Sequence, residues 1–236
     1  MYRYNYAGHD DARRLVAAGD SFVWGCVTKP PYYRGRRGPQ QAEPFTEILA
    51  KHLGLNYAEL GLRGASNWDI YKHLMLLELQ QSDLVLVVWS GPARHNRYHD
   101  TEAFYSTMWI EAIKNVTEHL DHVGCEYYYL SSFQDYRLSA PEPLPESCTK
   151  NWLWYNDAHS TLYDLCVKSN QSGFVKQGEF EHNHGSFPDT GISIEEYRYL
   201  SKKFAMTSKY ITGCHHPSQE GHEMLASLLH KQLATR

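Results

Sequence analysis

The sequence predicts a single α/β domain, a three-layer α/β/α arrangement around a mostly parallel sheet of about four or five strands. Short apolar runs alternate with amphipathic stretches along the chain, a pattern typical of strands joined by crossover helices. The clearest run is 84–89, six apolar residues in succession, which indicates a strand covered on both faces. A length of 236 residues favours one domain over 1–236.

The predicted elements follow one another in a regular order from the first strand onward. Strands are expected at 14–18, 56–60, 84–89 and 126–130. Helices are expected at 44–53, 68–80, 102–119, 157–167, 194–204 and 218–233. Loop insertions are expected at 29–43 and 134–150, which are rich in Pro. In a sheet of this kind ligands bind beyond the carboxyl ends of the strands, so residues there are the first candidates for a site.

Composition narrows the classes of function. Hydrophobic residues make up 42% of the chain and charged residues 21%, enough for a substantial core. The net charge of −4 argues against a nucleic-acid partner. The five Cys are widely spaced and form no CxxC pair, which indicates free thiols rather than a zinc ribbon or a disulfide framework.

The N-terminal residues are polar, and no apolar run approaches the roughly 18 residues that a membrane span requires. Without an apolar leader segment, no secretory signal is predicted. We therefore expect a cytoplasmic protein with no membrane partner.

A candidate nucleophile follows the first predicted strand, in Gly19-Asp20-Ser21-Phe22. A Ser at a tight turn after a strand exposes its hydroxyl, and its backbone N–H is available to an oxyanion. Gly19 permits the turn, and Asp20 can accept hydrogen bonds from nearby backbone amides. The alternative interpretation is an ordinary turn with a helix cap.

A candidate base stands at the start of the last predicted helix, in His216-Pro217-Ser218. A general base must lie within hydrogen-bond reach of the hydroxyl and needs a partner that orients its other nitrogen. The alternative is a surface histidine. His222 lies deeper in the helix and is expected to be structural, as a packing or capping residue.

Together these motifs resemble the SGNH/GDSL hydrolase family, whose fold is flavodoxin-like. Gly19 to Phe22 is similar to the first block of that family, and 60–67 is similar to the second. The resemblance implies that Gly64 donates its N–H to an oxyanion, beside the N–H of Ser21. His216 with Pro217 resembles the fifth block, which supplies the base. Similar small members occur in phage and bacterial genomes, so a phage-encoded chain would be associated with the virion.

The chain departs from the third block of the family. That block has an Asn whose side-chain amide completes the oxyanion hole, whereas Ala93 stands at this position after the matching Gly91. Asn67 or Arg94 is expected to supply the missing donor. Arg94 would add a permanent positive charge, which suits an anionic transition state.

The chain also lacks the acid that the family places shortly before the base, because these positions hold Gly213 and Cys214. A backbone carbonyl, His215 or Asp189 is left to orient His216. The prediction is therefore a Ser–His dyad with an unidentified orienting group. Such a dyad is chemically workable because the third member orients more than it reacts.

The leading hypothesis is a serine esterase or deacylase that forms an acyl-enzyme with a small ester, and an O-acetylated carbohydrate is the first candidate substrate. Asp20, Trp24 and Trp68 are the expected substrate-binding residues. Trp68 would stack on a sugar ring, together with Tyr32, Tyr33 and Tyr98. No cofactor is expected, and the sequence leaves the oligomeric state open.

Two other hypotheses belong to different classes. One is a catalytically weak or inactive binding or structural module on the same fold, motivated by the missing acid and the altered third block. The other is a metal-dependent hydrolase, suggested by the pairs His95/His99, His182/His184 and His215/His216. No HExxH pattern accompanies these histidines, so no metal is expected.

Overall fold

The structure is a computed structural model that describes residues 13–27, 40–91, 102–132, 144–153, 161–168, 210 and 216–235. Its centre is a four-stranded sheet in the order β4-β1-β5-β6, in which every pair is parallel. The strands are β1 (Arg14–Gly19), β4 (Asn56–Gly61), β5 (Leu84–Trp89) and β6 (Glu126–Ser131). The predicted fold class is therefore confirmed.

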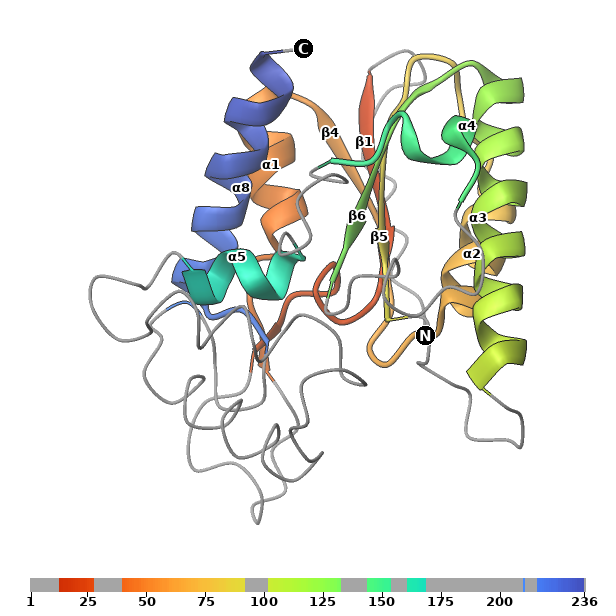
Figure 1. The fold of residues 1–236 in the computed structure, drawn as a ribbon. Helices are drawn as coiled ribbons and strands as arrows, with labels where there is room; N and C mark the ends of the chain where they lie inside the picture. The colour runs from red at the N-terminus through yellow and green to blue at the C-terminus, as the bar shows by residue number, and fades with distance from the viewer. Residues whose placement is uncertain are drawn as a thin grey trace.

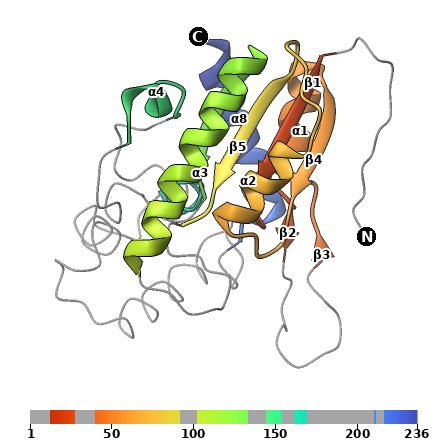
Figure 2. The same cartoon turned by 90° about the vertical axis from the view of Figure 1, so that its right-hand side faces the viewer.

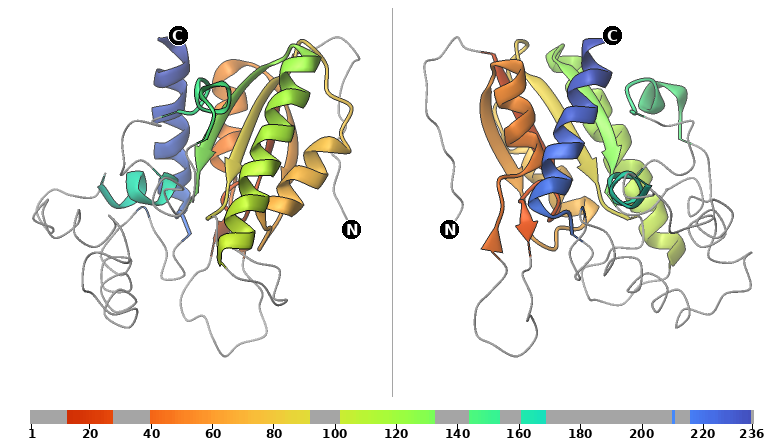
Figure 3. Two further views of the ribbon diagram at one scale, coloured as in Figure 1. Left: turned by 45° about the vertical axis from the view of Figure 1, so that its right-hand side comes forward. Right: turned by 90° about the vertical axis from the view of Figure 1, so that its left-hand side faces the viewer.

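Helices cover both faces of this sheet (Figure 1). On one face lie α1 (Phe45–Leu53), α5 (Leu162–Lys168) and α8 (Gln219–Ala234). On the other face lie α2 (Asn67–Met75) and α3 (Glu102–Val123), which pack side by side in Figure 2. Figure 3 shows that α8, the last helix of the chain, runs beside α1, the first. These two helices, far apart in the sequence, thus lie in one layer.

Strand β5 shows why the apolar run has no polar alternation. Leu84, Leu86 and Val88 point into the core beneath α1 and α8, whereas the residues between them point into the core beneath α2 and α3. All six side chains are buried. Fully burying such a side chain contributes about 1.5–3 kcal/mol, so a strand of this composition is stable only between two helix layers.

The order of the strands creates a switch point beside β1. The chain passes from β1 to β4 on one side and then returns across β1 to β5 on its other side. The strand ends are aligned there, since Gly19 is level with both Gly61 and Val88. In open parallel sheets, the crevice at such a point is where ligands bind. The turn after β1, which carries Ser21, lies at this place.

The predicted loop insertion at 29–43 includes one arm of a small hairpin. β2 (Cys26–Val27) pairs antiparallel with β3 (Gln40–Gln41), and the pairing continues where the Ala42 N–H donates to the Gly25 carbonyl at 2.7 Å. This hairpin joins the turn after β1 to the start of α1.

Two helices end at residues other than those predicted. The second helix was expected to reach Gln80 but ends at Met75. Leu77 and Leu79, whose apolar side chains suggested a longer helix, pack onto the core from irregular backbone. The third was expected to end near His119 but continues to Val123. It stops at Gly124, whose φ of 73° is a left-handed conformation that glycine adopts readily.

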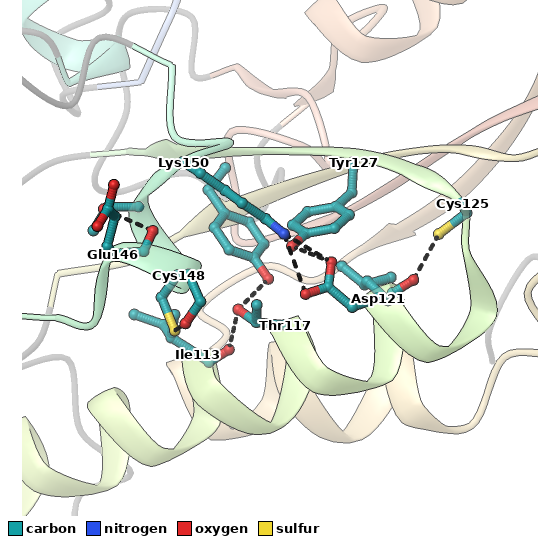
Figure 4. A network of polar contacts seen from close by, with 12 residues as sticks. Ile113, Thr117, Asp121, Cys125, Tyr127, Glu146, Cys148 and Lys150 are labelled. Atoms are coloured by element: carbon teal, nitrogen blue, oxygen red, sulfur yellow. Dashed lines mark hydrogen bonds and ion pairs between the residues drawn. The ribbon is translucent and has the colours of Figure 1, made fainter.

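The prediction of a loop over 134–150 is wrong near its end, where α4 (Glu146–Thr149) forms one helical turn. Figure 4 shows how Lys150, just after α4, forms an ion pair with Asp121 of α3 at 3.2 Å. Tyr127 of β6 donates to the same carboxylate at 2.9 Å. Beyond α4, Trp152 forms a bridge with Tyr129, so this segment covers the free edge of β6.

Of two further predicted helices, the structure describes only part of one. Residues 194–204 lie outside the described residues, and the predicted helix at 157–167 appears from Leu162 onward as α5. Within the described ranges, no helix is both long and apolar enough to cross a membrane.

Candidate active site

The turn that carries Ser21 begins at the last residue of β1. The N–H groups of Val23 and Trp24 both donate to the Asp20 carbonyl at 3.1 Å, which closes the turn tightly. Ser21 is buried, with 1% of its surface exposed. Gly19 must be a glycine here, since a Cβ would lie 2.4 Å from a methyl of Val23. The turn therefore holds Ser21 at the carboxyl edge of the sheet.

Asp20 fastens this turn with its side chain. One carboxylate oxygen accepts the Phe22 N–H at 2.9 Å, as the sequence suggested it would. The other accepts the hydroxyl of Ser132 at 2.9 Å. Asp20 is fully buried, and a buried carboxylate without hydrogen-bond donors would destabilise the fold. These two donors therefore hold the carboxylate in place.

His216 stands just before α8 and is positioned by the start of that helix. Ser218 is the N-cap, and its hydroxyl accepts the Gly221 N–H at 3.0 Å. The Ser218 N–H donates to the Tyr210 carbonyl at 2.9 Å. A Cβ on Gly221 would lie only 2.2 Å from that carbonyl oxygen, so glycine lets the backbone of Tyr210 approach the helix closely.

The fold brings these two motifs together. The Nε2 of His216 lies 2.8 Å from the Oγ of Ser21, a hydrogen bond between residues 195 positions apart. The imidazole also packs beside the ring of Phe22, with 6.0 Å between the ring centroids. This is the spacing that a general base needs to accept a proton from a serine hydroxyl.

His222 lies in α8, six residues after His216, and is fully buried. Its Nδ1 accepts the Phe45 N–H at 3.2 Å, at the start of α1, where the N-cap Pro44 provides no side-chain acceptor. Burial, and next the neighbouring His216, lower the pKa of His222 to about 3, so it is neutral at pH 7. It therefore caps α1 and is not a second base, in line with the structural role expected for it.

Two backbone N–H groups follow the ends of β1 and β4 and are left for a ligand. Among the described residues, the N–H groups of Ser21 and Gly64 have no hydrogen-bond acceptor. Gly64 adopts a φ of 78°, and space remains around the position of a Cβ. Ser21 is buried, and buried N–H groups without a partner are rare in proteins, whereas Gly64 is exposed.

Asn67 lies close to this edge, but its amide is engaged. The side-chain NH₂ donates to the carbonyls of Ser90 and Gly91 at 3.1 and 3.2 Å, and its oxygen accepts the Ser90 N–H at 2.8 Å. Both amide hydrogens are thus used in holding the end of β5 against the start of α2. In this arrangement Asn67 supports the site rather than offering a free donor.

Aromatic side chains stand at the start of α2 and in the turn after β1. Trp68 is 42% exposed and stacks on Tyr71, with ring centroids 4.9 Å apart and an interplanar angle of 28°. Trp24, at the end of the nucleophile turn, is half-buried, and its backbone presses against Gly61. An exposed aromatic face of this kind accepts apolar or ring-shaped groups.

Several predicted site residues lie outside the described residues, namely Arg94, Asp189 and His215, together with Tyr32, Tyr33 and Tyr98. The same holds for His95, His99, His182 and His184 of the metal hypothesis. Within the described part of the chain, no three His, Cys, Asp or Glu side chains are grouped as metal ligands.

Ser132 and Ser90 are the site residues that sequence reasoning missed. Each follows the end of a buried strand, where side chains meet those of the neighbouring strand ends. That position is the signal that could have found them, but a single Ser after a strand matches no motif.

Comparisons with known proteins give a consistent but distant likeness. No family model matches the chain, and no curated protein matches it. Solved structures match over most of their length. One is a candidate lipolytic protein of the G-D-S-L family from Desulfitobacterium hafniense, with 12% identity, a TM-score of 0.46, and 94% and 99% of the two chains covered.

A second is a carbohydrate acetylesterase from Sinorhizobium meliloti, with 17% identity, a TM-score of 0.44, and coverage of 94% of this chain and 99% of that one. A third is an α/β hydrolase enzyme from the metagenome of Lake Arreo, with 15% identity, a TM-score of 0.46, and coverage of 94% and 95%. At such identities the likeness does not extend to activity, so function has to be argued from the residues themselves.

Proposed function

We propose that the protein is a serine esterase or deacylase that forms an acyl-enzyme on Ser21, with His216 as its general base. The observation that carries this proposal is the 2.8 Å contact between the Ser21 Oγ and the His216 Nε2. A nucleophile and a base within hydrogen-bond reach form the arrangement that makes a neutral hydroxyl reactive. Both residues also stand at the carboxyl edge of a parallel sheet, where ligands bind.

In the proposed reaction, the Ser21 Oγ attacks the carbonyl carbon of the ester while its proton passes to the Nε2 of His216. The carbonyl oxygen becomes an oxyanion, for which the N–H groups of Ser21 and Gly64 are the proposed donors. The bond to the leaving alcohol then breaks, and His216 gives that alcohol its proton. Water next attacks the acyl-serine while His216 accepts its proton. The bond between the acyl carbon and the Ser21 Oγ then breaks, His216 returns the proton to that oxygen, and the acid is released.

The group that orients His216 and a further oxyanion donor complete the proposal. His215 and Asp189 are the proposed side chains for orientation, and Arg94 is the proposed donor. Loss of an orienting acid lowers kcat by about 10⁴-fold in a serine protease. Alanine variants at 189 and 215 therefore separate the two, because only one of them should slow the reaction to that extent.

An O-acetylated carbohydrate is the proposed substrate class. The stacked pair of Trp68 and Tyr71 supports it, because an exposed indole face can lie flat against the apolar face of a sugar ring. Trp68→Ala should raise KM for an acetylated oligosaccharide and leave KM for p-nitrophenyl acetate unchanged. Leu76→Ala, at the far end of α2 and 81% exposed, is the matched control and should change neither value.

A fluorophosphonate probe tests the proposed function directly, because it reacts only with an activated serine. The wild-type protein should be labelled, whereas Ser21→Ala should not. Ser227→Ala removes an exposed hydroxyl on α8 and should label as wild type does. Wild-type protein that stays unlabelled under these conditions would favour the alternative, a binding module on the same fold.

The metal-dependent alternative predicts a different outcome. Ester hydrolysis by the proposed dyad should persist after dialysis against a chelator, since neither step above involves a metal. Hydrolysis that stops on chelation and returns with a divalent ion would replace the serine mechanism.

A further inference from the structure

Ser132 occupies a junction of three parts of the fold. It follows β6 directly and is fully buried. Its N–H donates to the Trp89 carbonyl at 2.8 Å, at the end of β5. Its carbonyl accepts the Tyr163 N–H at 2.9 Å, at the start of α5. Both backbone groups are thus held by neighbouring elements, so the position of the side chain is set by the fold around it.

The hydroxyl of Ser132 points from this junction to the nucleophile turn. Its Oγ lies 2.9 Å from the Oδ2 of Asp20, and because a carboxylate only accepts, the hydroxyl is the donor. The Oδ1 of Asp20 holds the Phe22 N–H. A continuous path of hydrogen bonds therefore runs from the ends of β5 and β6, through Ser132 and Asp20, to both sides of Ser21.

We propose that Ser132 is a positioning residue for Ser21, acting through Asp20. The inference rests on the proposed function, since it concerns the geometry of that reaction. Ser132 anchors the carboxylate, the carboxylate anchors the turn, and the turn keeps the Ser21 Oγ in reach of His216. It also fixes the direction of the Ser21 N–H. A displacement of about 1 Å at a reacting atom can cost about 100-fold in rate, so a loosened turn should slow acylation measurably.

The test measures the rate of fluorophosphonate labelling of folded Ser132→Ala. We expect it to fall by about 10- to 100-fold relative to wild type. With p-nitrophenyl acetate, kcat should fall while KM stays within about twofold, because Ser132 contacts the nucleophile turn and no substrate. A labelling rate within twofold of wild type, in a variant with an unchanged circular dichroism spectrum, would overturn the inference.

A matched control separates positioning from loss of stability. Thr117 of α3 is also buried, and its hydroxyl bonds to the Ile113 carbonyl and to Tyr129, away from the site (Figure 4). Thr117→Val should lower the melting temperature but leave the labelling rate of the folded protein unchanged. Equal slowing in both variants would show that any buried hydroxyl has this effect, and the inference would fail.

A double-mutant cycle tests whether Ser132 acts through Asp20. If it does, labelling of the double variant Ser132→Ala/Asp20→Ala should be no slower than that of Asp20→Ala alone. Independent, multiplicative losses would overturn the proposed route. Should Ser132→Ala fail to fold, Ser132→Cys keeps a similar size with a weak donor and should be slower than wild type; an equal rate would contradict the inference. An unlabelled wild type would instead refute the proposed function, so the two failures are distinguishable.

Discussion

The reactivity of Ser21 depends on a second side chain, because a neutral hydroxyl is a poor nucleophile. His216 supplies an acceptor at 2.8 Å, and Phe22 packs beside its ring on the same turn. In the proposed mechanism, the N–H groups of Ser21 and Gly64 stabilise the oxyanion.

Replacing the base should therefore remove most of the activity while leaving the fold intact. His216→Gln keeps a polar side chain at a half-buried position but cannot accept and return a proton. We expect kcat for p-nitrophenyl acetate to fall by about 10²–10⁴-fold, the usual contribution of general acid–base catalysis. Activity within a few-fold of wild type, measured in the same assay, would show that another group takes the proton.

The nucleophile turn and the end of β4 are packed too closely for any side chain between them. A Cβ on Gly61 would lie 2.6 Å from the Trp24 nitrogen and 2.9 Å from the Val23 carbonyl carbon. These are backbone atoms, so relief requires the turn or the strand to move. The same contact that stabilises the layer thus sets the position of Ser21.

Gly61→Ala should reduce both stability and reactivity. Overpacking at a tight site costs about 1–3 kcal/mol, which urea unfolding would detect. The labelling rate of the remaining folded protein should fall as well, because the turn is displaced. Gly54→Ala is the control: it has a φ of 67° with open space around a Cβ, so it should cost stability but not labelling. Labelling of Gly61→Ala at the wild-type rate would contradict this account.

His222 connects α8, the helix that follows His216, to α1. Its Nδ1 caps α1 through the Phe45 N–H, and the two rings stack with an interplanar angle of 9°. His222→Leu keeps the packing but leaves that N–H without an acceptor. We expect a loss of about 1–3 kcal/mol in the free energy of unfolding. His222→Asn, which retains an acceptor, should recover part of it; an Asn variant no better than Leu would argue against the cap.

The same histidine should make the stability of the whole molecule depend on pH. Burial lowers the pKa of His222 from 6.5 to about 3 in the folded state, so the unfolded chain binds one more proton between these values. The free energy of unfolding is unaffected by this group above pH 6.5 and decreases as the pH falls from 6.5 towards about 3. The slope is about 1.4 kcal/mol per pH unit. His222→Asn should unfold with a shallower acid dependence, and identical slopes would contradict the shift.

Glu59 of β4 should act in the opposite sense. Burial, and next the charge of Glu47, raise the pKa of its carboxyl from 4.5 to about 7, and its Oε1 is buried without a hydrogen-bond partner among the described residues. The folded state therefore holds the proton more tightly, and stability is lost as the pH rises from about 4.5 to about 7. The difference in the free energy of unfolding between Glu59→Gln and wild type should therefore favour the variant more at pH 8 than at pH 4.5. A gain that does not change with pH would contradict this.

Patterns in the sequence predicted the sheet well because burial on two faces leaves a strong signal, as in Leu84 to Trp89. The same reasoning failed at 76–80, since Leu77 and Leu79 are apolar because they are buried and not because they are helical. The turn of α4 was missed because three prolines in 134–150 indicated a loop, although Pro145 stands at its N-cap.

The Ser–His pairing was predicted from motifs at the two ends of the chain, and the fold places the two atoms in contact. Asn67 or Arg94 was expected as an oxyanion donor, and only the structure shows that the amide of Asn67 is bound to Ser90 and Gly91. Ser132 was not anticipated, because its role depends on three backbone neighbours that come together only in the folded sheet.

The central claim is that Ser21 carries the acyl group, and mass spectrometry of an acid-quenched reaction tests it most directly. Protein mixed briefly with p-nitrophenyl acetate, quenched and digested should show one acetyl group on the peptide that contains Ser21. No such adduct should form in Ser21→Ala. An acetyl group found on another residue instead, or hydrolysis that persists in Ser21→Ala, would contradict the account.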